Sequence, residues 1–364
     1  MLAQRSVMPS TDSPSLYGIT EENSTRYGAS LWGKNQFNST FPLALCLYMR
    51  DHGLAPVAVI EQDGIITTDN GLWQMGDVIG ESDSRYLFET AFSPYAACVR
   101  GVVDKIDLVV SLGGEPLHPL EVKLTVVPDI ATASVAEDLW SPEMVMRPVS
   151  SAYAMMSVAA NLTDGLTRQS VMTSLRTGYN RISDWGNTVE IIQNAEYLRS
   201  ALDKALQMVA ASRLQRPFLL QPLWRTVGQS FELADNCFDV FVWSDVAVMR
   251  LSVDQSDDAT TVSRSMREVA RHVRALYEVL SQGDYNYEGI YKGMALDNQT
   301  DKAYALSGRK SIRYLAHPYL RQPRLPRSIL SSLILEGGER ELKPERRFDA
   351  AVVAYMIQQA GSHS

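Results

Sequence analysis

Asp107, Glu121 and Lys123 lie on two neighbouring apolar segments and have the types and spacing needed for metal-assisted hydrolysis of a phosphodiester bond. Residues 105–112 read KIDLVVSL and residues 120–127 read LEVKLTVV, which predicts two strands. Because successive side chains of a strand point to opposite faces, Glu121 and Lys123 share one face and the apolar residues share the other. An acid and an amine are therefore held side by side on a half-buried strand.

A turn or loop over Gly113 to Pro116 is expected to join the two strands into an antiparallel pair. In that pair Asp107 can lie beside Glu121. Two carboxylates a few ångströms apart repel each other unless a counter-ion is present, and a divalent cation removes that cost. Mg²⁺ prefers oxygen ligands, and the backbone carbonyl of Val122 is the expected third protein ligand.

Lys123 is expected to orient or deprotonate the attacking water and to offset negative charge in the transition state. A Glu-x-Lys pattern alone is usually a surface ion pair, so Asp107, 14 residues before Glu121, is what favours a catalytic site. Other acids remain as alternatives. They are Asp104 as a ligand in place of Asp107, Glu89 as an accessory acid from an adjacent helix or as a solvated residue, and Asp129 of a literal Pro-Asp pair, interpreted as a decoy.

The composition is that of a globular protein, with 364 residues, 45% hydrophobic and 21% charged. No apolar run approaches the length of a membrane span, and the polar residues 1–26 predict a flexible arm rather than a secretory signal. Three widely spaced cysteines predict free thiols in a reducing cytoplasm. The net charge of −8 argues weakly against nucleic acid, but residues 301–364 hold 11 Lys and Arg against 6 Asp and Glu. That basic segment either contacts DNA or is solvated surface.

The hydrophobic periodicity predicts a mixed α/β chain whose helices and strands alternate too irregularly for a doubly wound sheet. The expected helices are 41–53, 153–161, 188–213, 261–280 and 347–359, with basic loops over 309–327. The expected strands, besides the central pair, are a hairpin of 57–60 and 65–66 that turns at Asp63-Gly64, and the segments 218–227 and 239–253. Residues 67–90 are too rich in turn residues to assign. The expected organisation is an arm (1–26), a core (27–260) and a helical and basic elaboration (261–364).

Residues 31–42, LWGKNQFNSTFP, resemble an N-terminal signature of the HindVP-like type II restriction endonucleases. Asp107-Leu108-Val109 together with LEVKLTVVPD at 120–129 is similar to the catalytic region of that family, and the segment from Glu143 through Pro148 to Tyr153 is similar as well. The resemblance covers about residues 15–160.

The resemblance implies a PD-(D/E)xK core with a central mixed sheet flanked by helices, and Mg²⁺-dependent cleavage of both strands of double-stranded DNA at a short palindromic site. Enzymes of this group read the degenerate hexamer GRCGYC. A homodimer is expected because a two-fold protein matches a palindrome, with helices 188–213 and 261–280 as candidate interface elements or as core helices. A cognate DNA methyltransferase is expected in the same system. A repair or RNA-processing nuclease and a non-catalytic DNA-binding protein on the same fold are the alternatives.

Two groups of residues are candidates for DNA contacts, because amides and cations suit phosphates and base edges. They are Lys34, Asn35, Gln36 and Asn38 in the N-terminal signature, and Arg309, Lys310, Arg313, Arg321, Arg324 and Arg327 in the basic segment. The alternatives are helix capping by Asn38 and ordinary polar surface.

Overall fold

A computed structural model describes the parts of the chain that build its central sheet and helical layer. The described residues are 15–16, 19–20, 53, 56–69, 84–103, 105–122, 144–146, 148–224, 236–254, 264–294, 304–306 and 324–326. The expected helices over 41–53, apart from Gly53 in a turn, and over 347–359 lie outside these residues.

A mixed eight-stranded sheet forms the centre of the described fold. Its path runs β4-β3-β11-β10-β8-β7-β5, with β14 paired to β11. β3 runs parallel to β11 and β10 runs parallel to β8, whereas the other pairs are antiparallel. The strands are β3 (Val57–Gln62), β4 (Ile65–Asp69), β5 (Ser84–Thr90), β7 (Ile106–Leu112), β8 (Glu115–Val122), β10 (Pro217–Trp224), β11 (Asn236–Ser244) and β14 (Arg324–Pro326).

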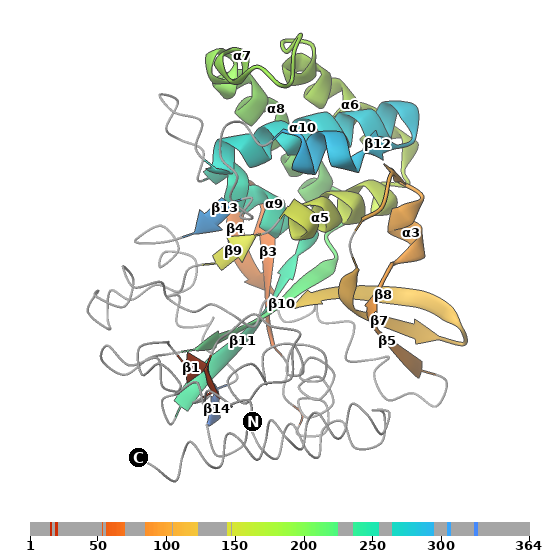
Figure 1. Ribbon diagram of the computed structural model, residues 1–364, viewed down its shortest axis with the longest axis vertical. Coiled ribbons are helices and arrows are strands. Elements are labelled where there is room, and N and C mark those ends of the chain that lie inside the picture. The colour runs from red at the N-terminus through yellow and green to blue at the C-terminus, as the bar shows by residue number, and fades with distance from the viewer. Residues whose placement is uncertain are drawn as a thin grey trace, which may run out of the picture.

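Helices gather on one side of this sheet and confirm the predicted mixed fold of a sheet flanked by helices (Figure 1). They are α3 (Ser93–Ala96), α5 (Pro148–Asn161), α6 (Gly165–Tyr179), α7 (Thr188–Gln193), α8 (Ala195–Ala211), α9 (Asp245–Asp254), α10 (Arg264–Gln282) and the π-helix η1 (Glu288–Lys292). Three short strand pairs complete the described elements: β1 (Ser15–Leu16) with β2 (Ile19–Thr20), β6 (Val99–Arg100) with β12 (Tyr285–Asn286), and β9 (Met144–Met146) with β13 (Tyr304–Leu306).

The predicted hairpin of β3 and β4 is confirmed, including its turn. Asp63 has φ 51° and Gly64 has φ 77°, so both central residues lie in the left-handed region. A two-residue turn of this kind matches the right-handed twist of the flanking strands, and an Asp-Gly pair adopts it readily. Strand β5 lies within the residues left unassigned, and the sequence did not predict it.

The helical layer contains the main hydrophobic core. α5 and α9 lie between the sheet and α10, and α6 and α8 pack against α10 (Figure 1). The apolar stripe predicted for residues 188–213 faces this core, since Leu198, Leu202, Leu206 and Val209 have no exposed surface. The buried face of α10 belongs to the same core, so the hydrophobic core continues across residue 260, where a domain boundary was expected. The expected division into domains stays a prediction.

The helix predicted over 188–213 is interrupted, which corrects the prediction. α7 ends at Gln193 and α8 begins at Ala195; Asn194 lies between them, and its backbone and side-chain N–H groups both donate to the carbonyl of Glu190. An Asn side chain that bonds a backbone carbonyl of the preceding turn competes with helix continuation. The uninterrupted apolar stripe hides this break, because both helices bury the same face.

The strand predicted over 239–253 is also wrong in its second half. β11 ends at Ser244 and α9 follows directly, with the Ser244 hydroxyl accepting from the N–H of Ala247 as a helix cap. The residues of α9 are nearly all buried, so their apolar run has no helical periodicity to distinguish it from a buried strand. The Ser244-Asp245 pair was the available helix-start signal.

The remaining expected helices agree with the structure. α5 begins five residues before the expected start, with Pro148 at its first position, where a missing N–H costs nothing. Residues 264–280 of the helix expected over 261–280 lie in α10, whereas residues 261–263 lie outside the described residues; α6 was not predicted. Within the segment expected to be basic loops, residues 324–326 form β14. None of the described helices is long and apolar enough to cross a membrane.

Candidate active site

The β7–β8 ladder positions the two predicted acids. Leu108 pairs with Leu120 and Val109 pairs with Pro119, so continuing this register by one residue sets Asp107 opposite Glu121. Directly opposite residues of antiparallel strands project to the same face with Cβ atoms about 4.5–5.5 Å apart. The pairing of β7 with β8 therefore agrees with the predicted placement of Asp107 beside Glu121, whereas their role as metal ligands stays a prediction.

The turn between these strands is shorter than expected, and a one-residue shift of pairing between Val110 and Ser111 lies between the turn and the two acids. Only Gly113 and Gly114 form the turn, with φ 60° and 91°, and β8 already begins at Glu115. β8 contains Pro116 and Pro119, which cannot donate to a ladder, and this favoured a loop. The sheet accepts them because β10 pairs with β8 only at Glu121 and Val122, so that among the described strands the earlier part of β8 pairs with β7 alone.

A third acidic residue lies in the same cross-strand row. In the β5–β7 pair, Phe88 is opposite Leu108 and Thr90 is opposite Ile106, so Glu89 occupies the position opposite Asp107. Of the two alternatives for Glu89, an origin on an adjacent helix is excluded, since Glu89 lies on strand β5. The row Glu89–Asp107–Glu121 thus runs across β5, β7 and β8.

The first turn of α5 covers the Glu121 end of this row. Ser150 Oγ donates a hydrogen bond of 2.6 Å to Glu121 Oε1, and Glu121 is only 4% exposed. Asp107 is half-buried. A negative charge near a helix N-terminus is favoured by the partial positive charge of the unpaired N–H groups there. Ser150 was not among the predicted site residues. The sequence marks it only as the third residue of a helix that starts at Pro148, which does not indicate a contact with Glu121.

The donor chemistry of these residues fits a hard divalent cation. Asp107 and Glu121 offer carboxylate oxygens, and Val122, the last residue of β8, offers its backbone carbonyl. In the described part of the chain no group of three or more His, Cys, Asp or Glu side chains could hold a metal ion. Two carboxylates, one carbonyl and several waters are a ligand set that Mg²⁺ commonly takes in proteins.

Several predicted site residues cannot be placed against this geometry. Lys123 and Asp104 lie outside the described residues, as does Asp129. So do the DNA-contact candidates Lys34, Asn35, Gln36, Asn38, Arg309, Lys310, Arg313, Arg321 and Arg327. Arg324 has a described backbone only, at the start of β14, where it pairs with Asp239 of β11.

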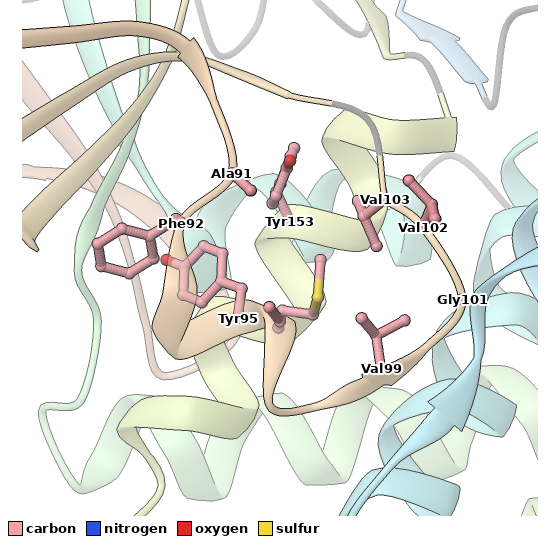
Figure 2. A pocket seen from close by; sticks show the side chains of 10 residues that line it. Ala91, Phe92, Tyr95, Val99, Gly101, Val102, Val103 and Tyr153 are labelled. Carbon is pink, nitrogen blue, oxygen red and sulfur yellow. The ribbon is translucent and has the colours of Figure 1, made fainter.

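A cavity of about 210 Å³ lies further along α5 from Ser150, between that helix and the α3–β7 segment (Figure 2). Its walls are apolar or aromatic. They comprise Ala91, Phe92, Tyr95, Ala96, Val99, Gly101, Val102, Val103, Tyr153 and Met156. It holds no carboxylate, amine or imidazole, so it lacks the groups for acid–base or metal chemistry. The acidic row, rather than this cavity, therefore has the groups that the expected chemistry needs.

Other buried polar groups serve the helical layer. Asp245 accepts hydrogen bonds from Ser157 Oγ at 2.7 Å and from the Arg216 N–H at 3.0 Å. Burial raises the pKa of Asp245 to about 6, although these donors oppose the shift. His272 Nδ1 lies 2.9 Å from the Tyr291 hydroxyl, and burial lowers the pKa of His272. Asp245 on α9 and His272 on α10 contact partners in or beside the helical layer, which indicates a structural role.

The fold is a mixed sheet flanked by helices, and Asp107 and Glu121 lie opposite each other on two of its antiparallel strands. This arrangement is that of a restriction-endonuclease-like core. The sequence profile described as "HindVP restriction endonuclease" matches residues 32–357. The chain is 30% identical over 347 residues to "Type II restriction enzyme HgiDI" of Herpetosiphon aurantiacus, covering 94% of this chain and 96% of the relative. It is also 30% identical over 344 residues to "Probable type II restriction enzyme HindVP" of Haemophilus influenzae, covering 93% of each. No solved structure was found to match the chain.

The chain belongs to the HindVP restriction endonuclease family. This confirms the family and the enzyme class predicted from the sequence, a type II restriction endonuclease. The matched region extends well beyond residue 160, where the recognised resemblance ended.

Proposed function

We propose that this protein hydrolyses both strands of double-stranded DNA at a short palindromic site in a Mg²⁺-dependent reaction. The observation that carries the proposal is the register that sets Asp107 opposite Glu121 on β7 and β8. The names of the two relatives support restriction over a repair or RNA-processing role. GRCGYC is the target that the sequence resemblance implies, and a cytoplasmic location with a cognate methyltransferase fits that role.

Each residue has a distinct task in the proposed site. Asp107, Glu121 and the Val122 carbonyl hold Mg²⁺, which supplies Lewis-acid stabilisation of the scissile phosphate when bound. Lys123 orients the attacking water and offsets negative charge as the phosphodiester bond breaks. α5 covers the row from one side and excludes water from Glu121, so that charge interactions there are stronger than at the surface.

The test is cleavage by Asp107→Ala and Glu121→Ala, which should each lose Mg²⁺-dependent cutting of plasmid DNA while still binding it. Fragment-end sequencing of the wild-type digest identifies the target and cut position. Lys123→Ala should lose at least ~10²-fold in rate, the scale for removing one preorganised charged group. Wild-type cutting by either carboxylate variant would remove the site assignment. Normal cutting by Lys123→Ala with a slightly lower melting temperature would make Lys123 a surface ion-pair partner instead.

A further inference from the structure

Ser150 contacts the acidic row from a different part of the fold. Its hydroxyl donates to Glu121 Oε1 at 2.6 Å, across 29 residues of sequence, and neither residue has more than 4% of its surface exposed. A hydroxyl–carboxylate bond of this length is in the range of charge-assisted hydrogen bonds, which are roughly twice as strong as neutral ones.

The contact limits how Glu121 can turn. A glutamate side chain has three rotatable bonds, and strand β8 fixes only where that side chain begins. One hydrogen bond to Oε1 selects the carboxylate orientation but consumes only one of about four lone-pair positions. A carboxylate can accept several contacts at once, so a hydrogen bond from Ser150 is compatible with metal ligation by the same group.

The support for Ser150 is rigid. Residues 150–159 of α5 are all buried, and a second serine on the same helix, Ser157, is bonded to Asp245 at 2.7 Å. A functional side chain is held most precisely when its own support is locked by packing and by further hydrogen bonds. α5 thus places the Ser150 hydroxyl at a fixed point over the acidic row.

We propose that Ser150 is a positioning residue that holds the Glu121 carboxylate in its cation-binding orientation. The inference rests on the proposed function of Glu121 and adds to it a residue that touches neither DNA nor metal. Ser150 acts only through Glu121. Removing such a hydrogen bond to a metal-ligating carboxylate typically costs 10–100-fold in metal affinity or activity.

The first measurement is Mn²⁺ binding to the full chain without DNA, followed by the electron paramagnetic resonance signal of the free ion. Ser150→Ala should weaken Mn²⁺ binding about 10–100-fold. Ser150→Cys keeps nearly the same volume but replaces the hydroxyl with a weak donor, so it should weaken binding as well. Ser150→Thr keeps the hydroxyl and should bind Mn²⁺ like the wild type. The Cys and Thr variants provide the answer if the alanine variant does not fold.

Ser151 provides a matched control. It is the next residue of α5 and fully buried, and its Oγ has no hydrogen-bond partner among the described residues. Ser151→Ala should therefore leave Mn²⁺ affinity and cleavage unchanged. A structural role for Ser150 would lower the melting temperature and leave Mn²⁺ affinity at the wild-type value, and that result would overturn the proposal.

Variants made in the Glu121→Ala background distinguish a failure of the positioning role of Ser150 from a failure of the proposed function. If Glu121 binds the cation and Ser150 acts through it, adding Ser150→Ala to Glu121→Ala should weaken Mn²⁺ binding no further. If Glu121→Ala itself binds Mn²⁺ normally, the proposed function fails. If Glu121→Ala loses binding while Ser150→Ala and Ser150→Cys keep it, only the positioning role fails.

Discussion

Asp107 and Glu121 occupy opposite positions on β7 and β8, one residue beyond the paired Leu108 and Leu120. This relationship depends on register, because a slip of one residue would turn Glu121 to the other face of the sheet. In a hairpin the register is fixed by the turn. Here the turn at Gly113-Gly114 is followed by a one-residue shift of pairing between Val110 and Ser111, so the turn and this irregularity together set the register of the acidic row.

Substitutions at the two turn glycines should change the free energy of unfolding by different amounts, because only Gly113 has a φ that other residues adopt readily. Gly113→Asn should alter the free energy of unfolding by less than about 0.5 kcal/mol, because Asn adopts φ near 60° and Asp63 already does so in the β3–β4 turn. Gly114→Ala should cost about 1 kcal/mol or more, since its φ of 91° strains any residue with a Cβ. Urea unfolding measures both. Gly165→Ala, with open space around the added Cβ, is the control and should be neutral. Equal costs at Gly113 and Gly114 would contradict this turn geometry.

Asp245 should make stability depend on pH in the mildly acidic range. Burial raises its pKa from 3.8 to about 6, so between these values the folded chain keeps a proton that the unfolded chain has lost. The free energy of unfolding therefore falls as pH rises through this window. Asp245→Asn lacks this titration, and its stability relative to the wild type should rise by on the order of 3 kcal/mol between pH 4 and 7. Urea unfolding at several pH values measures this; parallel profiles for the two proteins would show that Asp245 does not titrate in this way.

The helical core should respond strongly to the loss of a buried leucine. Leu202 on α8 has no exposed surface, so Leu202→Ala should lower the free energy of unfolding by about 2–5 kcal/mol. Leu166 on α6 is 82% exposed and provides the matched control, with an expected change within about 0.5 kcal/mol. Similar losses for both variants in chemical denaturation would be inconsistent with the packing of α8.

The acids could be predicted from the sequence because strand periodicity is local. Two residues per repeat put Glu121 and Asp107 on defined faces, and the glycine pair between the strands indicated antiparallel pairing. The hydrogen bond from Ser150 could not be predicted, because no sequence pattern between β8 and α5 indicates that the start of α5 packs against the end of β8. Such a contact depends on tertiary packing rather than on a pattern.

The errors in the helical layer have a similar cause. α9 is buried on all sides, so its sequence VAVMRLSV carries no amphipathic period, and β-branched residues favoured a strand. The break at Asn194 is hidden because α7 and α8 bury the same stripe. Burial on all sides removed the helical period from α9, and burial of one common face made the period of α7 continue into α8. Cap residues such as Ser244 were the more informative feature there.

The basic segment should contribute phosphate contacts to DNA binding. Residues 309–327 contain several arginines, and each contact with a phosphate releases counter-ions. Neutralising Arg313 and Arg321 together should reduce the slope of log affinity against log salt concentration by about 1.8, or about 0.9 for each contact. Lys204→Gln, on the exposed side of α8, should leave the slope unchanged. Fluorescence anisotropy over a salt series measures the slope, and an unchanged value in the double variant would make these arginines ordinary surface.

The protein is expected to act on DNA as a homodimer. A palindromic site presents two identical half-sites, and one acidic row cuts one strand, so a two-fold dimer matches protein symmetry to DNA symmetry. Sedimentation with a cognate duplex in Ca²⁺, an oxygen-preferring ion used here to hold the complex without cleavage, should give two chains per duplex. In Mg²⁺, mixing wild type with excess Glu121→Ala should then convert linear plasmid product into nicked circles, because mixed dimers hold one competent site. One chain per duplex, together with linear product that only falls in proportion to the wild-type fraction, would contradict the dimer and indicate a monomer that cuts the strands in succession.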